Sequence, residues 1–149
     1  MGSTVKLAND LYLETSSIVH KQGSQITPLD TYLDTIVESG SNSNGEYTKY
    51  SDGTMICSKR IIQKNVKLTN SWYTLFINEN DTMVDLGNYA ATFIEEPVVN
   101  ITYMGGNGCW LINNNSHSAS SPGKVQLCTV SSRTIGNLII DIIAIGKWK

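Results

Sequence analysis

The sequence predicts an all-β fold, an antiparallel β-sandwich of the jelly-roll kind, preceded by a small N-terminal hairpin and a short helix. After residue 45, short runs rich in β-branched and aromatic residues alternate with clusters of turn-forming residues. The first two runs are separated by Asp52-Gly53, a dipeptide typical of tight hairpins. No helical period interrupts the series, which disfavours a parallel βαβ sheet and favours a sandwich.

The N-terminal part is predicted to differ from the rest. Apolar and polar residues alternate over Val5–Thr15, which predicts a hairpin. Thr27 and Pro28 are typical of a helix start, and apolar residues then recur every three or four positions, so we expect a helix over Pro28–Glu38. The small polar residues of Ser39–Gly45 predict a flexible linker or a turn.

The remaining residues are predicted to form strands spaced as in a sandwich. These runs are Glu46–Tyr50, Thr54–Ile62, Trp72–Ile77, Tyr89–Ile94, Val98–Tyr103, Cys109–Ile112, Val125–Val130 and Leu138–Ile145. We therefore divide the chain into an N-terminal hairpin and helix segment, residues 1–40, and a β-sandwich domain, residues 46–149.

Composition excludes several classes of function. The 149 residues carry 11 Lys and Arg against 13 Asp and Glu, a net charge of -2, so nucleic acid is not an expected partner. The longest apolar stretch, Leu138–Ile145, is interrupted by Asp141 and is too short to span a bilayer. Only 16% of residues are charged, whereas the sequence has 16 Ser, 14 Thr and 14 Asn, so hydroxyls and amides are expected to supply the surface.

Cysteine and histidine usage offers no strong site. The three cysteines lack CxxC spacing and are expected to be reduced and buried. The two histidines, His20 and His117, give no metal-ligand spacing, so neither a metal nor a cofactor is predicted. His117 lies close in sequence to Cys109, but a catalytic pairing of the two is a weak alternative to an exposed loop histidine.

One region has the side chains that carbohydrate binding requires. A sugar is bound by an aromatic face that stacks on its apolar side and by amides and hydroxyls that hydrogen-bond to its alcohols. The candidate ligand-binding residues are Tyr103, Trp110, Asn113, Asn114, Asn115 and His117. Trp110 also fits a buried strand position, and the three asparagines also fit a long turn.

Three stretches resemble one family. NGEYTKYSDGTMIC over Asn44–Cys57, FIEEPVVNIT over Phe93–Thr102 and IGKWK over Ile145–Lys149 are similar to the C-terminal β domains of tail-tip, baseplate and receptor-binding proteins of siphophages that infect Gram-positive bacteria. The resemblance spans about 105 of the 149 residues. Ser17–Asp34 is similar to segments that attach such domains to the tail.

The resemblance implies a non-enzymatic protein of the distal tail of the virion, synthesised in the host cytoplasm. It implies a homotrimer, or else a hexamer, that contacts other tail or baseplate proteins and binds host cell-wall polysaccharide or teichoic acid. A membrane partner is not implied.

Two other functions stay open at this stage. A purely structural tail protein would use Val5–Thr15 and Pro28–Glu38 as its interaction surface. A polysaccharide-degrading enzyme would need two facing carboxylates, for which the candidates are Asp81, Asp85, Glu95 and Glu96.

Overall fold

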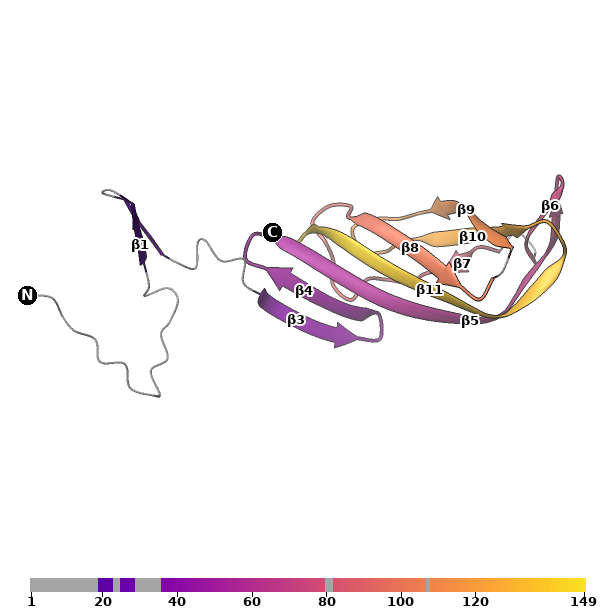
Figure 1. Ribbon diagram of the computed structural model, residues 1–149, viewed down its shortest axis with the longest axis horizontal. Helices are drawn as coiled ribbons and strands as arrows, with labels where there is room; N and C mark the ends of the chain where they lie inside the picture. The colour runs from indigo at the N-terminus through magenta and orange to yellow at the C-terminus, as the bar shows by residue number, and fades with distance from the viewer. Residues whose placement is uncertain (1–18, 23–24, 29–35, 80–81, 107) are drawn as a thin grey trace, which may run out of the picture. The chain divides into compact units, whose positions relative to one another are not determined.

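A computed structural model describes residues 19–22, 25–28, 36–79, 82–106 and 108–149 (Figure 1). The chain divides into two compact units, Met1–Thr35 and Ile36–Lys149, which are described separately. In the first unit, β1 (Val19–Gln22) and β2 (Gln25–Pro28) pair antiparallel. The hairpin predicted over Val5–Thr15 lies outside the described residues.

Of the two alternatives predicted over Ser39–Gly45, the flexible linker is wrong, and a turn is formed only at residues 43–44. Strand β3 (Ile36–Asn42) covers most of this segment and also the last residues of the predicted helix, whose residues 29–35 lie outside the described part. β3 pairs antiparallel with β4 (Gly45–Tyr50), and the ring of Tyr47 lies directly over Gly40. A Cβ at Gly40 would approach that ring to 2.9 Å, so the small residue makes room for packing and does not provide flexibility.

The second unit is an antiparallel β-sandwich, and the predicted fold class is confirmed. No α-helix occurs among the residues that the structure describes. Its other strands are β5 (Thr54–Trp72), β6 (Leu75–Asn78), β7 (Val84–Asp85), β8 (Val98–Met104), β9 (Cys109–Asn115), β10 (Lys124–Thr129) and β11 (Arg133–Lys147). One layer has the order β3-β4-β5-β11-β8, and β10 with β6, β7 and β9 forms the other (Figure 1).

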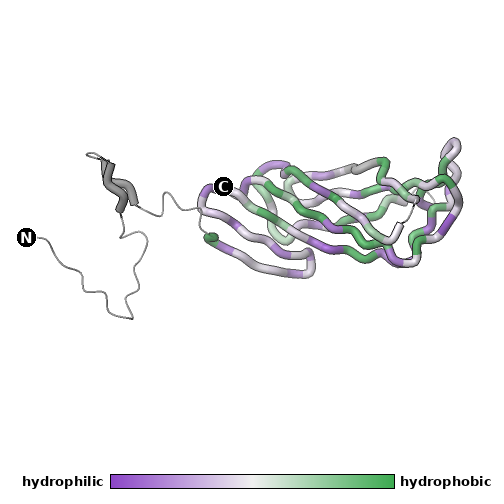
Figure 2. The backbone as a smooth tube through the Cα atoms, viewed as in Figure 1, coloured by the Kyte–Doolittle hydropathy of each residue, from purple (hydrophilic) through white to green (hydrophobic). Residues whose placement is uncertain are grey.

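The main core lies between these two layers. Leu138, Ile140 and Ile142 alternate along β11 and are buried, as expected for a strand with one face on the core. They meet Val125 and Leu127 of β10 in one cluster. Figure 2 shows that the hydrophobic residues of this unit are concentrated in its strands.

A smaller core cluster contains Met55, Cys57, Ala144 and the rings of Tyr89 and Phe93. The strand predicted over Tyr89–Ile94 is not formed. The main-chain N–H groups of Tyr89 and Phe93 donate to the carbonyls of Ser120 and Ala119, in a loop and not in a strand. The rings of Tyr89 and Phe93 are both buried and pack edge to face, with their centroids 5.2 Å apart. The apolar pattern of this segment therefore reflects the burial of these two rings.

Strand β5 continues ten residues beyond its predicted end at Ile62. Residues 63–72 are mostly polar, yet part of this stretch pairs with β11, whose Arg133 lies opposite Leu68. Polar residues are tolerated here because much of this part of the strand is exposed. Among the described residues, no helix is long and apolar enough to span a membrane.

Candidate functional site

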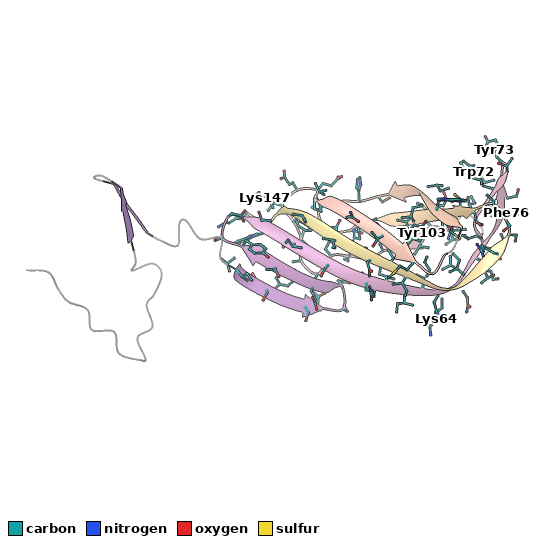
Figure 3. The ribbon with its side chains drawn as sticks, viewed as in Figure 1. Lys64, Trp72, Tyr73, Phe76, Tyr103 and Lys147 are labelled. Atoms are coloured by element: carbon teal, nitrogen blue, oxygen red, sulfur yellow. The ribbon has the colours of Figure 1, made fainter. Side chains whose placement is uncertain are left out.

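The predicted ligand-binding residue Tyr103 points into the protein. It lies on β8, is partly buried and packs against the main core. Its hydroxyl donates a hydrogen bond to the main-chain carbonyl of Cys109 on β9, and this bond links the two layers. Tyr103 (Figure 3) therefore supports the sandwich, and its ring packs against the main core.

Trp110, by contrast, is a surface residue. It lies on β9 between Cys109 and Leu111, which both contribute to the core, so its own side chain points away from it. Its exposed fraction is 48%. Asn113–Asn115 end the same strand, and β10 pairs with all three.

His117 follows β9 in a loop. Its Nε2 lies 2.9 Å from Oε1 of Glu96, and both side chains are about half exposed. The two groups form an ion pair when the imidazole is protonated. Tyr103, Trp110 and His117 thus occupy the core, an outward strand face and a loop, so they do not form one continuous surface. Their role in ligand binding stays a prediction.

A pair of exposed aromatic rings was not predicted as a site. Trp72 is the last residue of β5, and Tyr73 is the first residue of the turn into β6. Their ring centroids are 5.4 Å apart in an edge-to-face arrangement, and 89% of Tyr73 is exposed. Figure 3 shows both rings at the opposite end of the unit from Lys147. Tyr73 has a φ of 54°, a left-handed conformation that is uncommon and costly for a bulky residue.

Strand register places Trp72 and Trp110 on the same face. Asn70, Ile77, Cys128 and Trp110 lie directly opposite one another across β5, β6, β10 and β9. Residues opposite one another share a face, and so does Trp72, two positions beyond Asn70. Three strand spacings and two residues separate the tryptophans, so their Cα atoms are roughly 16 Å apart. We call Trp72, Tyr73 and Trp110 the aromatic end.

The segment that carries Trp72 and Tyr73 has no charged side chain. Residues 68–78 contain Asn70, Ser71 and Thr74 and no charged side chain. The flanking Lys67 and Glu79 are paired with each other, with Nζ and Oε2 3.3 Å apart. Exposed rings beside amides and hydroxyls are suited to a polyhydroxylated ligand.

The sequence contains a signal for this site that does not fit the strand predicted over Trp72–Ile77. The segment N-S-W-Y-T places two aromatic residues where a hairpin turn usually has Gly, Asn or Asp. Trp72 and Tyr73 were assigned to the start of a predicted strand, whereas the structure ends β5 at Trp72 and begins β6 at Leu75. Side chains in a turn lie beyond the end of the sheet, so the sheet does not bury them. An aromatic pair in a turn therefore indicates rings that are exposed to solvent.

The candidate catalytic carboxylates are held in separate places. Asp85 lies 3.7 Å from Lys124 Nζ, Glu96 is paired with His117, and Glu95 is exposed. Asp81 lies outside the described residues. A cleft of about 380 Å³ is lined by Asp85 and by Glu79, but each of these carboxylates has a lysine partner. Glycoside hydrolysis instead needs one protonated carboxyl beside an ionised one.

The cysteine prediction is confirmed. Cys57, Cys109 and Cys128 are all free and buried. Burial raises the pKa of the Cys57 and Cys128 thiols, which disfavours the nucleophilic thiolate. Among the described residues, no cluster of three or more His, Cys, Asp or Glu side chains could hold a metal ion.

The chain matches no protein family profile and no curated protein sequence. Two solved structures are similar to it. The N-truncated R1-type pyocin tail fiber is 14% identical, with a TM-score of 0.48 over 75% of this chain and 88% of that chain. A P. aeruginosa R1 pyocin fiber comprising C-terminal residues 323–701 is 15% identical, with a TM-score of 0.48 over 75% of this chain and 29% of that chain. Likeness at this level leaves function to be inferred from the site.

Proposed function

We propose that this chain is a bacteriophage tail or baseplate protein that binds host cell-wall carbohydrate, a polysaccharide or teichoic acid, without cleaving it. The aromatic end is the observation that carries this proposal. It offers two tryptophan side chains on one face, with the ring of Tyr73 beside Trp72 and with amides and hydroxyls in the same segment. This is the chemistry that recognises sugars, because the rings cover the apolar side of the ligand while polar groups bond to its alcohols.

The placement of the aromatic end also supports the proposal. Strand register sets Ile36 opposite Tyr50 and sets Thr54 opposite Lys147, so the residue that follows the first unit and the C-terminus lie at the same end of the sandwich. Trp72 lies at the other end (Figure 3). If the N-terminal segment attaches the protein to the distal tail of the virion, the aromatic end is free to face the host.

The absence of catalysis is part of the proposal. Carbohydrate binding requires no titratable group, and two of the candidate carboxylates are paired, Asp85 with Lys124 and Glu96 with His117. Incubation with purified cell wall should therefore release no reducing sugar ends. Release of such ends by the full chain would contradict this part.

The proposal is tested by binding of the full chain to a panel of immobilised cell-wall polysaccharides and teichoic acids from Gram-positive bacteria. Trp110→Ala should weaken binding at least about tenfold, the equivalent of losing one stacked ring worth about 1.4 kcal/mol. Ile94→Ala is the matched control, since Ile94 is exposed but its main chain is bonded to Lys147 at the other end. Equal binding by Trp110→Ala and the control would place the site elsewhere, and no binding to any glycan would favour a purely structural tail protein.

A further inference from the structure

Strand β5 has an unpaired stretch on one of its two edges. Strand β11 pairs with β5 along one edge, from Thr54 to Leu68. On the other edge, β4 pairs with Met55–Ser58 and β6 pairs from Leu68 onward. Among the described strands, none pairs with this edge over residues 59–67, a gap roughly 30 Å long at about 3.3 Å per residue. We call this edge of residues 59–67 the open slot.

The middle of the open slot has the geometry to accept a strand. Arg60–Lys64 is extended and pairs with β11, so alternate main-chain N–H and C=O groups of these residues point away from β11 and into the slot. Asn65 has a φ of 54°, a left-handed conformation that interrupts the regular strand. A regular edge of about five residues matches the usual length of a β-strand.

Hollows in the surface lie at both ends of the open slot. A hollow of about 540 Å³ is lined by Arg60 and by Gly45 at the end of β4, among others. The cleft of about 380 Å³ is lined by Gln63 and Val66 and by residues 82–85 of the other layer, among others. An added segment therefore has room at the β4 end and at the β6 end.

A side chain connects the two layers beside the open slot. Nζ of Lys59 donates hydrogen bonds to the main-chain carbonyls of Leu86 and Asn88, at 2.8 and 3.3 Å, in the segment that follows β7. The layers are thus joined here without a strand in the slot. A segment can therefore be added to the chain in its folded state.

The open slot is rich in positive charge. Residues 59–67 contain no acidic residue, and their basic residues are Lys59, Arg60, Lys64 and Lys67. Arg60 and Lys67 each have an acidic partner, Asp141 and Glu79. Lys64 is exposed, forms no ion pair with a described residue and points away from the strands in Figure 3. Like charges across a strand pair are destabilising, which disfavours a second copy of this edge, whereas an acidic side chain opposite Lys64 is favourable.

The two faces of β5 define the side-chain pattern of an added segment. Ile61 packs against the main core, and Arg60, Ile62 and Lys64 alternate with it and point outward. Residues opposite one another share a face, so alternate side chains of the segment lie on the core side, where Met83 lines the cleft. Apolar side chains suit the inward positions, and acidic side chains suit the outward ones.

We propose that the open slot binds an extended segment of another protein by strand addition, with apolar side chains toward the core and an acidic side chain opposite Lys64. Main-chain hydrogen bonds supply the affinity of such a complex, and the alternating side chains supply its selectivity. The proposal goes beyond glycan binding and does not rest on it, because Lys64 lies roughly 25 Å along β5 from Trp72 of the aromatic end.

The test is binding of a fluorescently labelled peptide, TVEVEVT, to the full chain, followed by fluorescence anisotropy. The peptide alternates valine with glutamate and should bind. The same peptide methylated at every main-chain nitrogen should not bind, because it cannot donate hydrogen bonds to the edge of β5. The basic peptide TVKVKVT should bind more weakly than TVEVEVT.

Reversing the charge of Lys64 should reverse this preference. Lys64→Glu should bind TVEVEVT about fivefold more weakly and TVKVKVT more tightly, because an attractive cross-strand pair becomes repulsive. Lys149→Glu is the matched control, since Lys149 is also exposed but lies beside Gly53, before the start of β5, and it should bind as wild type does. Circular dichroism shows that the variants are folded, and Lys64→Glu should keep the wild-type affinity for glycan.

Hydrogen exchange locates the bound peptide. Binding should slow the exchange of main-chain amides in residues 60–64 and leave those of β3 and β8 unchanged. The proposal is overturned if neither peptide binds, if Lys64→Glu binds TVEVEVT as tightly as wild type, or if the protection falls on β3 or β8. Protection of residues 60–64 in the free protein that is lost on dilution, together with a dimeric mass, would assign the slot to a second copy and would also overturn it.

Discussion

Replacing Tyr89 by phenylalanine should stabilise the protein. The ring of Tyr89 is buried against Phe93 in the smaller core cluster, and only 7% of the residue is exposed. Its hydroxyl is buried and has no hydrogen-bond partner among the described residues. A buried hydroxyl without a partner costs about 1–3 kcal/mol, and phenylalanine keeps the ring and its packing. We therefore expect Tyr89→Phe to raise the free energy of unfolding by about 1 kcal/mol at neutral pH, or about 4 °C in Tm.

The gain should grow at alkaline pH. Burial raises the pKa of Tyr89 from 10.0 to about 12. Above pH 10 the unfolded chain releases the phenolic proton while the folded chain retains it, so wild type loses stability between pH 10 and about 12. The loss is up to about 3 kcal/mol, since the pKa is raised by about two units and one unit is worth about 1.4 kcal/mol. Tyr89→Phe has no such proton and lacks this loss.

The assay is urea unfolding followed by circular dichroism at pH 7, 9 and 11. Tyr73→Phe is the matched control, because it removes a hydroxyl that is exposed to solvent. Its stability should follow wild type at each pH. The reasoning is refuted if Tyr89→Phe is less stable than wild type at pH 7, or if the difference between them does not widen from pH 9 to pH 11.

Three other perturbations have defined outcomes. Asn78→Ala should cost about 2 kcal/mol in urea unfolding, because buried Asn78 accepts a 2.8 Å hydrogen bond from the main-chain N–H of Leu127; exposed Asn137→Ala should cost far less. The hydrogen bond from Lys49, and to a smaller extent that from Tyr47, lowers the pKa of Glu38 below 4.5. The free energy of unfolding of wild type should therefore fall as the pH drops below that value, and that of Glu38→Gln should fall less steeply. An equally steep fall in the unfolding free energies of the two proteins would contradict that assignment. A thiol reagent should react slowly with the native protein, because all three cysteines are buried, and should modify three thiols per chain once urea has unfolded it. Fast reaction of the native protein would show that the cysteines are accessible.

Local signals predicted the parts of the fold that local chemistry decides. Gly53 has a φ of 86°, and a carboxylate oxygen of Asp52 accepts a 2.7 Å hydrogen bond from the N–H of Thr54, so the turn that joins β4 and β5 follows from its residues. The strand predicted over Leu138–Ile145 is likewise formed, as part of β11, because its run of β-branched residues favours an extended backbone.

Elements that depend on distant partners were missed. Strand β3 consists largely of small polar residues, and its place is fixed by Tyr47 packing over Gly40. Tyr89–Ile94 has a strand-like composition but is bonded to a loop about 30 residues away. The first relation depends on the register of the β3–β4 hairpin, and the second joins segments too far apart to be seen in a short window of the sequence.

The candidate site was predicted in part for the same reason. Trp110 was predicted as a binding residue because asparagines and a histidine follow it closely in the sequence, and it does lie on the surface. Trp72 belongs beside it only because four strands, β5, β6, β10 and β9, align their registers. Tyr103 was grouped with Trp110 by closeness in sequence, yet successive strands place their rings on different faces.

The measurement that tests the central claim most directly is the affinity of the full chain for a cell-wall glycan with and without its two exposed tryptophans. Trp72→Ala and Trp110→Ala should each weaken binding about tenfold, and the double variant about a hundredfold, because sites roughly 16 Å apart contribute independently. Unchanged affinity in the double variant, with the fold intact, would contradict the claim that the aromatic end binds the glycan.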